Sequence, residues 1–216
     1  MRLDRWFVVL SAACFAGAAS AQVVAGRQAE KLPSSSNEWT SFLGVYGYLG
    51  AGEPAYGSST GSADHHWLHL EARYNYENLK TGSLWTGYNF LAGHAWVLQV
   101  TPLFGVVFGK TTGLAPGYEF SWTYKRLELY SEGEYVCHTK HKDDAFFYSW
   151  HELRYSPVNW WHFGLVDQGS KAHRTEFEAQ RGVSLGFRRQ HLDYTTYTFL
   201  TGSGGPSVVL ALSYTF

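Results

Sequence analysis

The residues of this sequence whose chemistry and spacing best suit them to act together are glutamates. Glu128, Glu132 and Glu134 are separated by even numbers of residues, so in a β-strand their carboxylates project from one face. Buried like charges raise one another's pKa unless a cation pairs with them. Such a face could transfer protons, attract a cation or form ion pairs with arginine. The charges that we expect to act together are Glu71, Arg73, Glu119, Glu128, Glu132, Glu134, Glu152 and Arg154.

Segment 137–144 (CHTKHKDD) contains a second set of chemically versatile side chains. His138 and His141, with a cysteine and two aspartates around them, offer ligands of the kinds that Zn²⁺ and Cu²⁺ bind. The spacing is weak support for a metal site, because two lysines in the same segment oppose a cation. We therefore expect a solvated loop of mixed charge, no metal site beyond these weak candidates, and no cofactor.

Histidine and serine residues elsewhere could belong to a hydrolytic enzyme. Segment 64–69 (DHHWLH) combines an acid with histidines, and Ser149 and His151 share one face of a strand that also carries apolar residues. A lipid hydrolase of the membrane would need such a lipid-facing pair. However, the chain has no nucleophile motif such as G-x-S-x-G, and its glycines form no phosphate-binding pattern. We therefore expect no enzymatic activity.

The elements that position these side chains are β-strands. From about residue 65 onward, apolar and polar residues alternate with period two, for example Tyr118, Phe120, Trp122 and Tyr124 with the polar residues between them. Aromatic residues make up 18% of the chain and charged residues 16%, below the roughly 25% charged residues of average soluble domains. This composition excludes a disordered chain, and a net charge of −1 provides no basic face for nucleic acid.

Rings near the ends of the strands favour a membrane barrel over a soluble β-sandwich. A sandwich core is mainly aliphatic, whereas the aromatic residues of a membrane barrel gather at the two membrane interfaces. Here rings recur at strand ends, among them Tyr88 and Phe90, Trp160 and Trp161, and Tyr214. The charged residues of the opposite face then point into a polar lumen, where water or a partner can solvate them. No later segment reaches about 18 consecutive apolar residues, which argues against membrane-spanning helices.

Residues 1–21 have the pattern of a secretory signal peptide. Two arginines precede an apolar run, and Ala19-Ser20-Ala21 matches an A-x-A cleavage site. We expect cleavage after this site. The exported chain then keeps only Cys137, so it has no internal disulfide.

The C-terminus carries alternating Leu210, Leu212 and Tyr214 before a terminal Phe216. This pattern resembles the signal by which outer-membrane barrels are recognised for assembly. With the signal peptide and the alternating strands, the chain is similar to the small, single-chain outer-membrane β-barrel proteins of Gram-negative bacteria, without features of a particular subfamily. The resemblance implies an all-β fold, a transmembrane antiparallel up-and-down barrel in the cell outer membrane. It also implies three partners, namely the barrel-assembly machinery, outer-membrane lipid and lipopolysaccharide.

The connections alternate between tight turns and longer polar loops, which predicts one orientation. Bacterial barrels have short periplasmic turns and longer outer loops, so a periplasmic C-terminus places every tight turn on the periplasmic side. Counting from residue 65 gives about ten strands in a barrel domain of residues 65–216, closed by pairing of segments 65–76 and 207–216. Residues 22–64 are then a periplasmic arm. Segment 39–49 also alternates and could add a strand, so twelve strands is the second-best count.

Without a motif for covalent chemistry, the predicted barrel is either a narrow porin-like channel for small solutes or a structural surface barrel. In a structural barrel, ion pairs between carboxylates and arginines fill the lumen. In a channel, the excess of acid favours cations over anions. Proton transfer is the weakest interpretation, since nothing in the sequence fixes the separation of the carboxylates. An outer-membrane lipid-modifying enzyme or protease is the alternative from another functional class. We expect no nucleic-acid partner.

Overall fold

The computed structural model describes residues 38–50, 54–139, 145–172, 175–201 and 205–216. These ranges contain one antiparallel sheet of 13 strands. No helix in them is long and apolar enough to cross a membrane. The strands are β1 (Thr40–Gly50), β2 (Tyr56–His65), β3 (Leu68–Tyr74), β4 (Thr81–Tyr88), β5 (Phe90–Ala92), β6 (Trp96–Gly109), β7 (Gly113–Tyr124), β8 (Leu127–His138), β9 (Phe146–Val158), β10 (Trp161–Ala172), β11 (Glu178–Arg189), β12 (Leu192–Phe199) and β13 (Ser207–Thr215).

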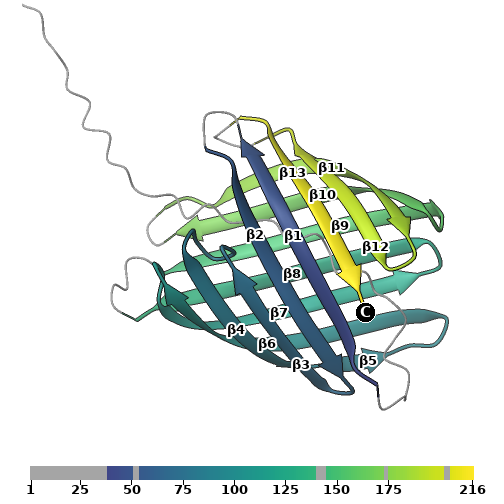
Figure 1. Cartoon of the computed structure of the whole chain (residues 1–216), viewed down its shortest axis with the longest axis horizontal. Helices are drawn as coiled ribbons and strands as arrows, with labels where there is room; N and C mark the ends of the chain where they lie inside the picture. The colour runs from purple at the N-terminus through teal and green to yellow at the C-terminus, as the bar shows by residue number, and fades with distance from the viewer. Residues whose placement is uncertain (1–37, 51–53, 140–144, 173–174, 202–204) are drawn as a thin grey trace, which may run out of the picture.

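The sheet closes on itself into a barrel (Figure 1). β1 pairs with β13, so that Val45 lies opposite Leu212, and β4 pairs with β6. β5 continues β4 after a break at Asn89 and pairs with the same strand, β6. β4 and β5 therefore share one position in the wall, which has 12 strands. Closure removes the two edges of an open sheet, whose unpaired backbone groups a membrane interior does not tolerate.

The wall contains two strands that precede the predicted barrel domain. The expected fold class is confirmed, but the count of ten strands is too low and the second-best count of twelve is right. The wall begins at Thr40 instead of residue 65, and β13 pairs with β1 instead of segment 65–76. Residues 40–50 and 56–64 of the expected arm, residues 22–64, are thus barrel wall. Residues 22–37 and the predicted signal peptide lie outside the described ranges.

The strand that the sequence pattern did not predict is β2, which forms a hairpin with β1. Its sequence is YGSSTGSADH. Its inward residues Ser58, Thr60 and Ser62 alternate with outward Gly57 and Gly61, so small residues occupy both faces. Period-two alternation of hydrophobicity is therefore weak in this segment. The backbone of β2 nevertheless pairs along its length with β1 and with β3, because ladder hydrogen bonds do not depend on side-chain polarity.

The two ends of the barrel have different connections. One end, called the turn end below, carries Phe216 and the tight turns between β2 and β3, β7 and β8, β9 and β10, and β11 and β12. His66, Lys125 and Gln190 in these turns have φ of 53°, 55° and 56°, the left-handed conformation that short hairpin turns favour. The opposite end, the loop end, carries the connection of residues 75–80 and most of the longer ones. The four two-residue turns and the C-terminus thus share one end, as expected, although the connection of residues 110–112 between β6 and β7 at the loop end is also short.

Apolar side chains cover the outside of the wall, and charged side chains point inward. Phe104 is 50% exposed and Leu212 is 42% exposed, whereas Glu152 is 2% exposed. Leu98, Val100 and Phe120 on the outer face are half-buried by their neighbours, and Leu210 is exposed. This is the reverse of a soluble sandwich. Rings stack on the outer surface at the turn end, including Trp67 on Tyr88, Trp160 on Phe187 and Tyr214 against Phe216.

Candidate functional site

The lumen contains an ion-pair group centred on Arg73 of β3. Its guanidinium donates from Nη2 to Oε2 of Glu71 at 3.0 Å and from Nη1 to Oε2 of Glu134 at 2.9 Å. Glu134 lies on β8, which is not adjacent to β3 in the sheet, so this bond spans the lumen. The guanidinium carbon also lies 4.3 Å from the centre of the Tyr76 ring and 4.5 Å from that of Trp85. Arg73 therefore connects distant parts of the wall.

Neutral donors hold the neighbouring carboxylates. The hydroxyls of Tyr76 and Tyr130 donate to the two oxygens of Glu132 at 2.6 and 2.8 Å. Thr60 donates to Oε1 of Glu71 at 2.6 Å. In the connection between β3 and β4, Glu77 accepts a hydrogen bond from a serine of β4. Burial raises the pKa of the Glu77 carboxyl, although the positive charge of Arg73 opposes this shift.

A second ion-pair group surrounds Arg154 of β9. Its guanidinium holds both oxygens of Glu152, with Nη2–Oε2 at 3.0 Å and Nε–Oε1 at 3.3 Å. Ser184 and Tyr197 donate to the same carboxylate at 3.0 and 3.2 Å. Half-buried Glu128 of β8 lies directly across the ladder from Arg154 and so shares its inward face. Arg154 thus holds Glu152 on the inner face, as Arg73 holds Glu71 and Glu134.

The turn-end part of this second group contains a buried histidine. Nε2 of His162 lies 3.0 Å from Oδ2 of Asp193, and Nε of Arg188 donates to the same oxygen at 3.3 Å. Thr195 donates to Oδ1 of Asp193 at 2.8 Å. This aspartate thus has three partners of different types, which fixes its position at the inner rim.

Aromatic side chains fill the loop-end half of the lumen. Trp150 packs edge-on against Tyr197 and Phe199, with ring centres 5.2 and 5.8 Å apart, and Tyr148 packs likewise on Tyr76. All five are at most 2% exposed. The space between Arg73, Tyr76, Glu132, Glu134 and Tyr148 has no room for a water molecule. This filling was not predicted, although Tyr148 and Trp150 have the same strand parity as the inward Glu152.

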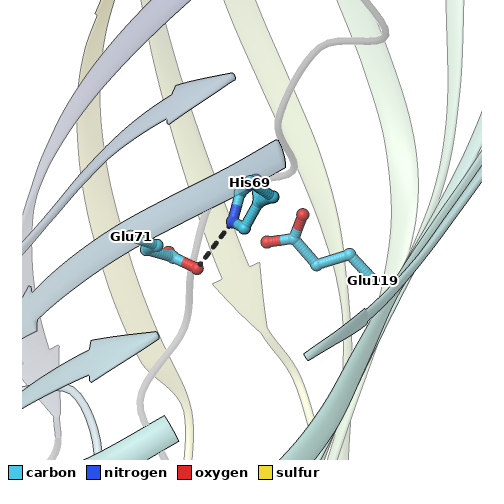
Figure 2. Close-up of side chains that lie close together, drawn as sticks. All are labelled: His69, Glu71 and Glu119. Carbon is cyan, nitrogen blue, oxygen red and sulfur yellow. Dashed lines mark ion pairs between the residues drawn. The ribbon is translucent and has the colours of Figure 1, made fainter. Parts of the chain in front are cut away.

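A third group lies nearer the turn end and combines a histidine with carboxylates. His69 of β3 is 0% exposed, and its Nδ1 lies 2.7 Å from Oδ1 of Asp64 on β2. Its Nε2 faces Oε2 of Glu71 at 3.6 Å, and Figure 2 shows its ring between the carboxylates of Glu71 and Glu119. One ligand atom from each of these three residues lies within 4.8 Å of the others. The pattern of the sequence did not connect Asp64 and His69 with the two glutamates.

The other predicted site residues are dispersed. His138 lies at the loop-end terminus of β8, and His141 lies outside the described residues, so the weak metal candidate stays a prediction. Leu210, Leu212 and Tyr214 point outward on β13, with Phe216 following the strand. Their role in barrel assembly also stays a prediction.

Among the described residues of the outer wall, a serine and a histidine lie in contact. Ser149, which shares the outer face with His151, is only 4% exposed. The histidine instead places its Nδ1 2.9 Å from Oγ of Ser131, directly across the ladder on β8. Tyr118 contacts the same Oγ at 3.2 Å. The pair that touches is therefore Ser131 and His151, and only cross-strand register brings them together.

Comparisons with known proteins concern the fold. No protein-family model matches the chain, and no curated protein sequence does. Among solved structures, the KdgM porin superposes with a TM-score of 0.55 at 10% identity, covering 81% of this chain and 99% of that chain. The same porin in complex with disordered oligogalacturonate gives 0.54 at 10% identity, covering 82% and 99%. The NanC porin gives 0.55 at 12% identity, covering 80% and 98%.

Proposed function

We propose that this chain, which has the barrel fold of outer-membrane porins, is a narrow channel of the bacterial outer membrane that prefers small cations. The observation that carries the proposal is the charge of the lumen. Among the described lumen residues, Arg73, Arg154 and Arg188 face a larger set of carboxylates: Asp64, Glu71, Glu77, Glu119, Glu128, Glu132, Glu134, Glu152 and Asp193.

The location in the outer membrane is supported by the outer face. Its apolar band is bounded at the turn end by stacked rings, the arrangement that membrane interfaces favour. Outer-membrane lipid and lipopolysaccharide would contact this face. Export by the signal peptide at residues 1–21, and recognition of Phe216 and the preceding alternation by the barrel-assembly machinery, belong to the same proposal.

Electrostatics favours cations over anions. Arg73 is shared between Glu71 and Glu134, and Arg154 is held by Glu152, so the guanidinium groups do not neutralise the other carboxylates. A channel with walls of low dielectric constant concentrates this surplus negative potential. The oligogalacturonate of the KdgM complex is a polyanion. The acidic lumen of this chain would repel such a solute.

Packing of the lumen limits the conductance. Twelve strands lie between the roughly eight that side chains just fill and the 16–18 that leave an aqueous channel. The buried rings of Tyr148, Trp150 and Phe199 occupy the loop-end half. We therefore expect a low conductance, through a path that small ions can enter and large solutes cannot.

Planar-bilayer recordings test the proposal. With a salt gradient across the bilayer, the reversal potential of the purified protein should have the sign of a cation-preferring channel. A reversal potential of anion-preferring sign would overturn the acidic-lumen argument. Absence of any conductance, in a protein shown to be folded by circular dichroism, would remove the channel and leave a structural surface barrel, in which the ion pairs only fill the lumen.

A lipid-directed hydrolase is a second candidate function, favoured by the contact between Ser131 and His151. Attack of the serine Oγ on a lipid ester carbonyl, with proton transfer to the histidine and from it to the departing oxygen, would give an acyl-serine and release the alcohol. A fluorophosphonate probe in detergent micelles should then label Ser131 and not the covered Ser149. Equal labelling of the wild type and Ser131→Ala would exclude this function.

A further inference from the structure

We propose that His69, Glu71 and Glu119 form a binding site for a divalent cation of the Zn²⁺ type in the turn-end half of the lumen. The three side chains come from the inner faces of β3 and β7, which are separated in the wall by β4 and β6. Each is buried, at 0%, 6% and 5% exposure. The site is separate from the segment that contains His138 and His141, and it does not depend on whether the lumen conducts.

The orientation of the His69 ring suits a metal ligand. Its Nδ1 lies 2.7 Å from Oδ1 of Asp64, the length of a charge-assisted hydrogen bond. Its Nε2 lies 3.6 Å from Oε2 of Glu71, which is too long for a hydrogen bond. The asymmetry fits a ring that donates from Nδ1 to Asp64 and turns its Nε2 towards Glu71.

Asp64 has the position of an orienting group. Histidines that bind metals usually donate their other ring N–H to a carboxylate or a carbonyl, which fixes the tautomer. Asp64 is itself held, because Asn89 donates from Nδ2 to its Oδ1 at 2.8 Å, and Thr101 donates to Oδ1 of Asn89 at 2.7 Å. Asn89 is the residue at the break between β4 and β5, so the shape of the wall contributes to the orientation of the ligand.

The distances are close to those of a bound ion. The three ligand atoms lie within 4.8 Å of one another. Zn–N and Zn–O bonds of about 2.0–2.2 Å in a tetrahedral site place ligand atoms about 3.3–3.5 Å apart. The contraction needed is about 1 Å, which the side-chain torsions of Glu71 and Glu119 can supply. A water molecule would complete the coordination.

Charge and ligand type favour zinc over calcium or magnesium. One imidazole with two carboxylates is a borderline donor set that suits Zn²⁺, whereas calcium and magnesium sites consist of oxygen ligands. Arg73 touches Glu71 and brings one positive charge, but it is shared with Glu134. With Asp64 and Glu119 included, the surroundings of the proposed ion are net negative.

Calorimetric titration of ZnCl₂ into the EDTA-treated protein, purified in detergent without a polyhistidine tag, tests the site. We expect one zinc ion per chain. His69→Gln and Glu119→Gln should abolish this binding, and Asp64→Asn should weaken it by about 10–100-fold, as loss of an orienting group does elsewhere. His162→Gln is the matched control, because His162 is another buried histidine bonded to an aspartate, and it should bind zinc like the wild type.

Three outcomes would overturn the proposal. Absence of zinc binding by the folded wild type is the first. The second is unchanged affinity in His69→Gln. The third is loss of binding in a variant with His138→Ala and His141→Ala, which would place the ion at the segment 137–144. Circular dichroism of each variant establishes that the barrel has formed. Zinc binding is measured without any recording of conductance. Absence of zinc binding therefore does not affect the channel proposal, and absence of conductance in the bilayer does not affect the proposed zinc site.

Discussion

Replacing Arg73 with methionine tests whether the charge network of the lumen stabilises the barrel. The arginine side chain is 3% exposed and lies between Glu71 and Glu134, at 3.0 and 2.9 Å. Methionine has a similar apolar length, so the substitution removes the charge with little loss of volume. It leaves two buried carboxylates without their guanidinium. Removing one partner of a buried ion pair costs about 3–5 kcal/mol, and we expect the free energy of unfolding to fall by this amount.

Urea unfolding in detergent micelles, followed by tryptophan fluorescence, measures the change. Arg181→Met is the matched control: Nε of Arg181 lies 3.2 Å from Oδ2 of Asp167 on the outer wall, but its side chain is 76% exposed. Exposed pairs contribute about 0–1 kcal/mol. The double variant Arg73→Met/Glu134→Gln should recover part of the lost stability, because one of the two uncompensated charges is gone.

The reasoning is wrong if Arg73→Met destabilises the protein no more than Arg181→Met does. It is also wrong if the double variant is less stable than Arg73→Met alone. In that case the carboxylate of Glu134 would contribute to stability through contacts other than the ion pair.

Three further predictions concern single positions. Glu132→Gln removes a lumen charge that accepts hydrogen bonds from two tyrosines, so the cation-over-anion permeability ratio from bilayer reversal potentials should fall; an unchanged ratio would place the selectivity elsewhere. Burial raises the pKa of the Glu77 carboxyl in the folded state. The folded state therefore binds this proton more tightly than the unfolded state, whose pKa is about 4.3. The resulting contribution to the free energy of unfolding is complete below the unfolded pKa and is lost as pH rises through the folded pKa. Glu77→Gln should therefore stabilise the barrel relative to wild type at about pH 8 and not at about pH 4, as urea unfolding at both pH values would detect. A methyl group at Gly105 would approach the Trp85 ring to 2.4 Å, whereas one at Gly47 would meet nothing within 4 Å. Gly105→Ala should therefore lower the free energy of unfolding by about 1–3 kcal/mol, and Gly47→Ala by much less. Similar unfolding midpoints for the two variants would contradict this packing.

Local pattern in the sequence was sufficient for the architecture of most of the wall. Alternation separates the outward Leu212 from the inward Glu152 because successive side chains of a strand point to opposite faces, whatever the strand pairs with. Turn lengths gave the relative direction of consecutive strands for the same local reason. The exception is β2, where small residues on both faces carry no alternation, so the strand count and the closing partner of β13 could not be obtained from pattern.

The contacts of the candidate site were decided by the tertiary structure. Which inward side chains meet across the lumen depends on the number of strands and their stagger around the ring, and neither is encoded in a single strand's pattern. Two additional strands in the ring and the closure through β1 determine that Arg73 reaches Glu134 and that His69 faces Glu119. The sequence alone determined that these residues point inward, because that depends only on strand parity. Their partners required the closed barrel, because those contacts join residues that are far apart in the chain.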